Sequence, residues 1–365
     1  MEPDTPLFPV EFLRPTTRDV ARAVRDGGAD ALVGAEWRAD HARYQEIHCR
    51  SALNRVDGMP FQWTLNPYRG CTHACHYCFA RRYHSQFELD SDDEFASVIL
   101  VKRNLVPVLE RELARPAWSR DVVAVGTATD PYQPIEGHYG LTRGALQALG
   151  RASTPVGIVT KGPLVVRDVD VLTELSARAS CSVYVSVPSV DEDAWRRLEP
   201  GTAPPLQRLR AVKTLADAGV RAGVLMAPLV PGITTHPKIV ARTVAAIADH
   251  GAQFVGANLL FLEGGTRAHF LAFLEREYPH LCERYGSLYA GGKRADARYA
   301  SEVRAMVRGL QERAGLRRSE YEDRAAEARA RAATGELAAD APASTAASST
   351  QSSFRWDDDG GDYVP

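Results

Sequence analysis

The sequence predicts an α/β fold: a partial (β/α)6 TIM-like barrel with an N-terminal extension, C-terminal helices and a disordered tail. Two patterns support this prediction. Runs of β-branched apolar residues alternate with amphipathic helical patterns, which is typical of repeated βα units around a parallel sheet. Six such units can be counted, two fewer than a closed eight-stranded barrel needs, so we expect an open barrel.

The predicted strands are the apolar runs themselves. A parallel strand in such a fold is covered on both faces, so nearly all of its side chains are apolar. The six runs span residues 61–65, 122–126, 156–160, 182–187, 222–227 and 254–261. Predicted helices between them end at glycines such as Gly219 and Gly251, as helix C-termini prefer. Ligands of such folds bind at the carboxyl ends of the strands, so we expect the functional residues there.

The flanking segments complete the predicted domain organisation. Residues 1–60 form an extension without a clear period, 61–290 the barrel, 291–335 a helical region and 336–365 an acidic tail. The tail is rich in Ala, Ser and Asp. Such a composition cannot bury enough apolar surface to fold, so the tail is predicted to be disordered.

Composition narrows the class of protein. Hydrophobic residues make up 45% of the chain and charged residues 25%, values typical of a soluble globular protein. The net charge of −2 argues against a dedicated electrostatic DNA binder, although it leaves room for a local basic groove.

No apolar run is long enough to span a membrane and the N-terminus lacks a secretory pattern, so we expect a cytoplasmic protein. In that reducing compartment, six cysteines favour metal ligands, catalytic groups or core residues over disulfides.

Three cysteines, Cys71, Cys75 and Cys78, fall together in NPYRGCTHACHYCFAR, directly after the first predicted strand. Their spacing lets one short loop present three thiolates to a single metal centre, and thiolates select zinc or iron–sulfur clusters. Zinc would take His73 or His76 as a fourth ligand. Structural zinc usually uses two separated ligand pairs, however, and no second pair follows. An iron cluster on three thiolates would leave one iron open to a ligand.

These three cysteines, with Tyr77 just before the last, resemble the motif of the radical S-adenosylmethionine (SAM) superfamily. Within that superfamily, the cysteine segment is similar to the spore photoproduct lyase branch, also called DNA repair photolyase-like. So are GTATDPYQPIE at 126–136 and EPGTAPPLQRLRAVKTLADAGVRAGVLMAPLVPGI at 199–233. The resemblance covers about residues 61–278.

The resemblance implies a radical SAM enzyme. In that family the three cysteines hold a [4Fe-4S] cluster whose fourth iron binds the amino and carboxylate groups of SAM. One electron, delivered by a donor such as flavodoxin or ferredoxin, cleaves SAM to methionine and a 5'-deoxyadenosyl radical that abstracts hydrogen from a substrate. The substrate here is unidentified: nucleic acid is one candidate, and a peptide or a cofactor precursor are others. The alternative function is a non-catalytic, zinc-stabilised binding module.

The same resemblance implies SAM contacts at the strand ends. After the second strand, most radical SAM proteins have a Gly-Gly-Glu-like segment that hydrogen-bonds the SAM amino group, and this sequence has GTATD at 126–130. Lys161, after the third strand, resembles a lysine near SAM in spore photoproduct lyase. Ser186 ends the fourth strand, and Arg208 could pair with the SAM carboxylate. The predicted cofactor-binding residues are Tyr77, Gly126, Thr127, Thr129, Asp130, Lys161, Ser186, Glu199 and Arg208.

Several of these positions also have a purely structural alternative. Asp130 could simply end a strand with the proline that follows it. Lys161 could be an ordinary solvated lysine, and Ser186 part of a polar core layer. Glu199 and Arg208 could pair with each other.

No catalytic residue beyond the cofactor site can be identified. Spore photoproduct lyase uses an additional cysteine as a hydrogen donor, and this sequence has no counterpart. The solitary Cys49, Cys181 and Cys282 are expected to be small core residues instead. Tyr132 and Tyr184 are candidate radical relays, although a tyrosine is far more often part of the core or rim packing.

Overall fold

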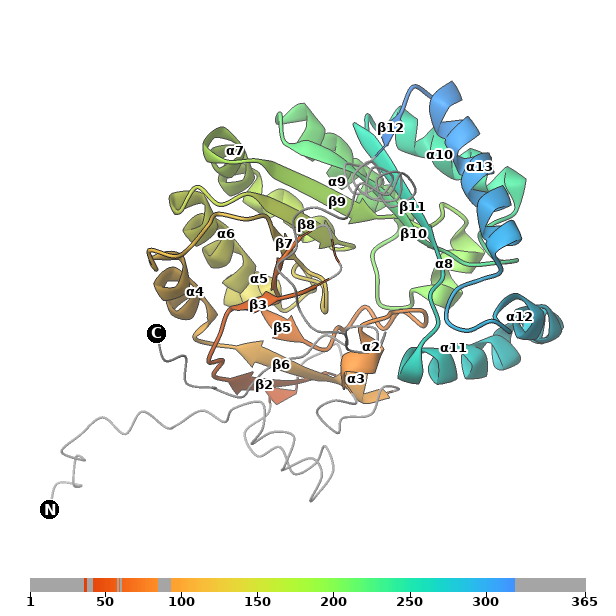
Figure 1. The fold of residues 1–365 in the computed structure, drawn as a ribbon, viewed down its shortest axis with the longest axis horizontal. Helices are drawn as coiled ribbons and strands as arrows, with labels where there is room; N and C mark the ends of the chain where they lie inside the picture. Colours follow the sequence, from red (N-terminus) through yellow and green to blue (C-terminus); the bar gives the residue numbers. More distant parts are fainter. Residues whose placement is uncertain (1–35, 38–41, 58, 60, 85–92, 319–365) are drawn as a thin grey trace, which may run out of the picture.

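The computed structural model describes residues 36–37, 42–57, 59, 61–84 and 93–318. Their strands form two sheets, one of eight strands and one of four. The larger sheet curves through the molecule, with helices along its outer side, and the smaller sheet lies at one end of it (Figure 1). The predicted tail at 336–365 lies outside the described residues.

The larger sheet contains the predicted barrel. Its order is β12-β11-β10-β9-β8-β7-β4-β3, and the six strands from β11 to β4 run parallel. β3 and β12 form its two edges, so among the described residues the sheet is open, as a partial barrel requires. All six predicted strands are confirmed. The strands are β3 (Leu53–Arg55), β4 (Trp63–Leu65), β7 (Val123–Val125), β8 (Val156–Thr160), β9 (Cys181–Ser186), β10 (Arg221–Leu229), β11 (Phe254–Leu259) and β12 (Arg317–Arg318).

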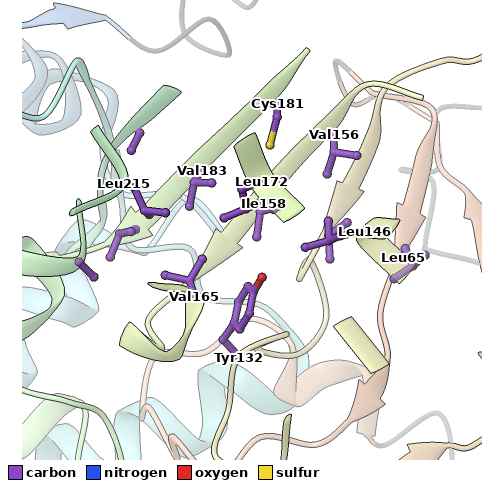
Figure 2. Close-up of a cluster of buried hydrophobic side chains, with 14 of the residues drawn as sticks. Leu65, Tyr132, Leu146, Val156, Ile158, Val165, Leu172, Cys181, Val183 and Leu215 are labelled. Carbon is purple, nitrogen blue, oxygen red and sulfur yellow. The ribbon is translucent and has the colours of Figure 1, made fainter. Parts of the chain in front are cut away.

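The helices pack on the sheet through apolar faces. In α9, Val212 and Leu215 are fully buried, and strand residues such as Ile158 and Val183 meet helix residues such as Leu172 in one core (Figure 2). The helices are α2 (Arg81–His84), α3 (Asp93–Ser97), α4 (Leu105–Leu113), α5 (Glu136–Tyr139), α6 (Leu141–Arg151), α7 (Val169–Arg178), α8 (Glu192–Leu198), α9 (Pro205–Asp217), α10 (Pro237–Asp249), α11 (Gly264–Glu277), α12 (Cys282–Leu288) and α13 (Ala297–Arg313), with the 3-10 helices η3 (Pro163–Asp168) and η4 (Pro279–Leu281).

The predicted helix ends are confirmed where glycine follows the helix. Gly219 after α9 and Gly251 after α10 have φ angles of 81° and 69°, the left-handed conformation that glycine adopts without strain. Helix α13 agrees with the helical composition predicted after residue 291, and β12 then joins the sheet beside β11. In the part of the chain that the structure describes, no helix is both long and apolar enough to cross a membrane.

The smaller sheet was not predicted from the sequence. Its order is β1-β2-β6-β5, formed by Glu36–Trp37, Arg43–Ile47, Val98–Lys102 and Tyr68–Arg69. β2 runs parallel to the fully buried β6. Strands β1 to β3 therefore occupy a stretch for which no periodic element was predicted.

Candidate cofactor site

The three predicted metal ligands share one loop between β5 and α2. Two turns shape this loop: the N–H of Ala74 donates to the carbonyl of Cys71, and the N–H of Cys78 donates to that of Cys75, both at 3.2 Å. Cys71 and Cys75 are buried and Cys78 is half-buried. The structure therefore places the three cysteines in one short, tightly turned loop.

The surroundings of Cys75 and Cys78 disfavour ionisation of their thiols in the absence of a cation. Burial raises the pKa of Cys75 and Cys78, while the positive charge of Lys161 acts in the opposite direction. A bound metal deprotonates its thiol ligands and supplies the missing positive charge. The donor set therefore fits a thiolate-ligated metal centre.

Segments from later in the chain hold the backbone of the cysteine loop. The N–H of Gly201 donates to the carbonyl of His73 at 3.1 Å, and the hydroxyl of Thr266 donates to that of Cys78 at 3.0 Å. A Cβ at Gly201 would lie 2.1 Å from the carbonyl oxygen of Thr72, so only glycine permits this approach.

Arg81, which the sequence analysis did not single out, fixes the loop from within. Its guanidinium is almost fully buried and donates to the carbonyls of Cys75 and Ala74, both at 3.1 Å. The same group lies 4.9 Å from the ring centroid of Phe95. The hydrogen bonds to these loop carbonyls explain why an arginine is buried three residues after the last cysteine.

The histidines of the zinc hypothesis are engaged elsewhere. His76 Nδ1 lies 2.9 Å from His269 Nε2, and its ring stacks on Phe273. His73 Nδ1 lies 3.2 Å from an Asp130 carboxylate oxygen. Among the residues that the structure describes, no three His, Cys, Asp or Glu side chains converge closely enough to bind a single metal ion. An iron–sulfur cluster takes one thiolate on each of several irons, so its cysteines do not have to meet at one ion.

The segment after β7 lies against the cysteine loop. Gly126 has a φ of 89°, and a Cβ there would lie 2.4 Å from the carbonyl oxygen of Val159, so no other residue fits. Thr127 accepts a hydrogen bond from the Asn66 amide at 3.2 Å, which ties the end of β7 to that of β4. The Thr129 hydroxyl donates to the carbonyl of Gly70 at 2.6 Å, directly before the first cysteine.

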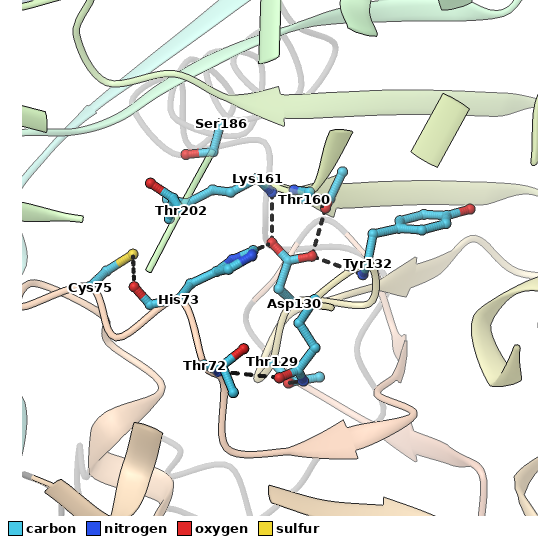
Figure 3. Close-up of polar contacts among 12 residues, drawn as sticks. Thr72, His73, Cys75, Thr129, Asp130, Tyr132, Thr160, Lys161, Ser186 and Thr202 are labelled. Carbon is cyan, nitrogen blue, oxygen red and sulfur yellow. Dashed lines mark hydrogen bonds and ion pairs between the residues drawn. The ribbon is translucent and has the colours of Figure 1, made fainter. Parts of the chain in front are cut away.

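Asp130 joins the segment after β7 to the end of β8 and to the cysteine loop (Figure 3). One carboxylate oxygen accepts from the Thr160 hydroxyl at 2.6 Å and the Tyr132 N–H at 2.9 Å. The other accepts from the Lys161 N–H at 2.6 Å and faces His73 at 3.2 Å. Burial raises the pKa of Asp130, but His73 and Thr160 outweigh it and lower that pKa to about 2. Burial conversely lowers the pKa of His73, but the charges of Cys71 and Asp130 raise it to about 10.

Tyr77, Glu199 and Arg208 form a second polar group beside the cysteines. The Tyr77 hydroxyl donates to one oxygen of Glu199, and Arg208 donates to the other at 2.5 Å. Arg208 also donates to the carbonyl of Ser186 at 2.8 Å. Burial raises the pKa of Glu199, but Arg208 and Lys161 outweigh it and lower that pKa. Since Glu199 and Arg208 are almost fully buried, their mutual pairing is the arrangement present in the structure.

Lys161 and Ser186 lie at the same rim. The Lys161 ammonium is 5.5 Å from the ring centroid of Tyr77. Burial lowers its pKa, but the negative charges of Cys75 and Glu199 outweigh it and raise that pKa, so Lys161 is not an ordinary solvated lysine. The Ser186 hydroxyl donates to the carbonyl of Ala227 at 3.2 Å and bridges β9 to β10.

The remaining candidates take part in packing. Tyr132 is buried behind Asp130, and the ring of Tyr184 lies 4.8 Å from that of Phe254. Cys181 is buried at the start of β9, the end of the strand opposite to Ser186. Cys282 begins α12.

Gln133 is a further contact that the sequence analysis missed. Its buried amide accepts from the N–H of Thr72 at 3.2 Å and donates to the Thr129 hydroxyl at 3.0 Å. A glutamine eight residues after the end of β7 and four residues beyond Thr129 is the sequence signal that could have indicated this contact.

An open parallel α/β barrel with a three-cysteine loop at the end of its first parallel strand defines a class of SAM-dependent iron–sulfur enzymes. Residues 65–271 match the sequence model of the Radical SAM superfamily. The chain therefore belongs to the radical SAM superfamily. It is an enzyme, and the zinc-stabilised module is wrong as an alternative. Members of this family use an iron–sulfur cluster and SAM, and they need a reductant.

The chain is also similar to other proteins and to solved structures. Over 274 residues the chain is 39% identical to the uncharacterized protein Rv2578c of Mycobacterium tuberculosis (strain H37Rv). The match covers 74% of this chain and 81% of that protein. It is 25% identical to the uncharacterized protein MJ0683 of Methanocaldococcus jannaschii over 71% of this chain and 90% of that protein. A solved mutant of spore photoproduct lyase superposes with a TM-score of 0.57 at 17% identity, covering 74% of this chain and 79% of that one. This last likeness establishes a common fold.

Proposed function

We propose that the chain holds a [4Fe-4S] cluster on Cys71, Cys75 and Cys78. When bound, the cluster and SAM supply the chemistry, namely reductive cleavage of SAM to a 5'-deoxyadenosyl radical that abstracts hydrogen from a substrate. The observation that carries this proposal is the single loop with three clustered cysteines in a chain of the radical SAM superfamily. Its buried thiols are the groups that such a cluster would deprotonate.

We assign the predicted SAM-binding residues two kinds of role. Lys161, Ser186 and Thr127 line the strand ends beside the cysteine loop and would face the ligand, while Gly126 forms the turn after β7 that places Thr127 there. The ammonium of Lys161 would complement the carboxylate of SAM.

The other residues of the set would act from behind the ligand. Glu199 and Arg208 satisfy each other, and Tyr77 is bound to Glu199. Thr129 is bound to the backbone of Gly70. These side chains would hold the cysteine loop in place while the first set contacts SAM.

Nucleic acid is the first substrate class to test. Solved structures of spore photoproduct lyase, which has this fold, include one with bound AdoMet and a dinucleoside spore photoproduct. We place the reaction in the cytoplasm, with flavodoxin or ferredoxin as candidate electron donors.

Anaerobic reconstitution tests this function. Protein purified with iron and sulfide should hold iron, and after dithionite reduction with SAM it should release 5'-deoxyadenosine, measured by chromatography. Cys75→Ala should lose iron, whereas Cys181→Ala, the matched control of a buried cysteine outside the loop, should keep it. Iron-loaded protein that binds SAM but forms no 5'-deoxyadenosine with any reductant would contradict the proposal.

A further inference from the structure

Three cationic side chains surround the ring of Phe261 at the rim of the barrel. Phe261 lies two residues after the end of β11, and its backbone pairs with that of Arg294. The guanidinium carbons of Arg82 and Arg294 lie 6.0 Å and 5.9 Å from the centroid of this ring, and the ammonium nitrogen of Lys293 lies 5.5 Å from it. An aromatic ring attracts cations at such distances and so holds them in place. Together Arg82, Lys293 and Arg294 form a basic patch.

The basic patch keeps an excess of positive charge. Glu263 forms an ion pair with Arg82 and another, at 3.0 Å, with Lys293. With Glu263 included, three positive charges meet one negative charge, so the group remains positive. Arg294 is exposed, and the side chains of Arg82 and Lys293 are each 24% exposed. Acidic groups of a partner can therefore reach all three cations.

The basic patch borders the cysteine loop at Cys78. Arg82 is on α2, which follows the last cysteine and packs beside α11 (Figure 1). Near the start of α11, the Thr266 hydroxyl donates to the carbonyl of Cys78 at 3.0 Å. The segment after β7 contacts the same loop elsewhere, at Thr72 and His73. The patch is thus close to a proposed cluster ligand and consists of residues other than those assigned to SAM.

We propose that the basic patch is the docking surface for an acidic one-electron carrier protein. This inference rests on the proposed function, because the electron is delivered to a cluster on the cysteine loop. The carrier loses one electron and the cluster gains it, so no bond forms or breaks. Transient redox complexes use small interfaces, and complementary charges speed their encounter. A few exposed cations beside Cys78 fit such an interface, because electron transfer weakens steeply with distance.

The test compares two reductants on the reconstituted holoenzyme. Reduced flavodoxin, an acidic protein, is the probe of docking, whereas dithionite is a small reductant that needs no docking surface. In the double variant Lys293→Gln/Arg294→Gln, cluster reduction by limiting flavodoxin should slow about tenfold at low ionic strength. Saturating flavodoxin should restore most of the rate, and reduction by dithionite should stay at the wild-type rate. The decrease of the visible absorbance of the cluster measures both rates.

A matched control and a binding measurement accompany this test. Arg298→Gln removes an exposed arginine of α13 that pairs with Glu302 outside the patch, and it should leave both rates unchanged. In the wild type, the rate with flavodoxin should fall as the ionic strength rises, because salt screens exposed charges. Binding of oxidised flavodoxin, measured by biolayer interferometry, should weaken in the double variant by about the factor seen in the rate.

The outcomes separate this inference from the proposed function. Equal flavodoxin-driven rates in the double variant and the wild type at low ionic strength would overturn the inference alone. So would an equal loss of rate with dithionite, because the two residues would then act on the cluster itself. A double variant that loses affinity for a single-stranded oligonucleotide but keeps its flavodoxin-driven rate would assign the patch to a nucleic-acid substrate instead. A wild-type protein that holds no iron would contradict the proposed function, and the inference with it.

Discussion

The cysteine loop contacts two buried carboxylates, and these are stabilised in different ways. Asp130, which meets His73, has a hydroxyl and two backbone N–H groups as its other donors. Glu199, which meets Tyr77, depends instead on the cation of Arg208. At the first carboxylate the charge of His73 acts together with three neutral donors, whereas at the second one ion pair dominates. The second region should therefore be more sensitive to the loss of a single side chain.

Loss of the Arg208 cation should have the largest effect. Arg208→Met leaves Glu199 as a buried charge without its counterion, which costs about 3–5 kcal/mol in the free energy of unfolding. Urea unfolding of the metal-free protein measures this. Arg298→Met, at an exposed ion pair with Glu302, should change little. The double variant Arg208→Met/Glu199→Gln should recover much of the loss, and a double variant as unstable as the single one would contradict the ion-pair explanation.

Removal of the Tyr77 hydroxyl should have an intermediate effect. Tyr77→Phe takes a hydrogen bond from a charged acceptor, which contributes about 1.5–3 kcal/mol. Tyr285→Phe is the control, because that hydroxyl donates to the neutral carbonyl of Pro231 and should contribute only about 1 kcal/mol. Equal losses in thermal unfolding would show that the charge of Glu199 does not strengthen the bond.

The smallest effect is expected at Asp130. Thr160→Val removes one of its donors and should cost about 1 kcal/mol at neutral pH. The pKa of Asp130 is lowered to about 2 in the folded protein, against about 4 in an unfolded chain. The stability that this carboxylate contributes is therefore present above pH ~4 and is lost as the pH falls toward 2. Urea unfolding at pH 7, 5 and 4 should show the difference from wild type beginning to shrink at the lowest pH, and a difference that grew on acidification would have the wrong sign.

The sequence predicted the six parallel strands because each is a short run rich in apolar residues that lies between amphipathic helical patterns. β6 is an equally apolar run, but its partner β2 mixes polar residues such as Gln45 with apolar ones. Parallel pairing between β2 and β6 joins residues 55 positions apart, as in Arg43 with Val98, and no local pattern reveals such a pairing.

The same distinction applies to the site. The cysteines were found because their spacing is local. The contact of Asp130 with His73 depends instead on how the ends of β4, β7 and β8 lie beside one another. Arg208 was expected to be able to bind either SAM or Glu199, since a separation of nine residues permits both. Only the three-dimensional arrangement distinguishes these alternatives.

The close approach of Gly201 to the cysteine loop indicates the order in which the barrel folds and the cluster is inserted. The loop takes its shape against Gly201 and Thr266, which are synthesised more than a hundred residues after Cys71. During translation the three thiols therefore emerge long before their backbone has its final supports. We expect iron and sulfide to be inserted into a barrel that has already folded, so that delivery of the cluster is a late step in the biogenesis of this enzyme.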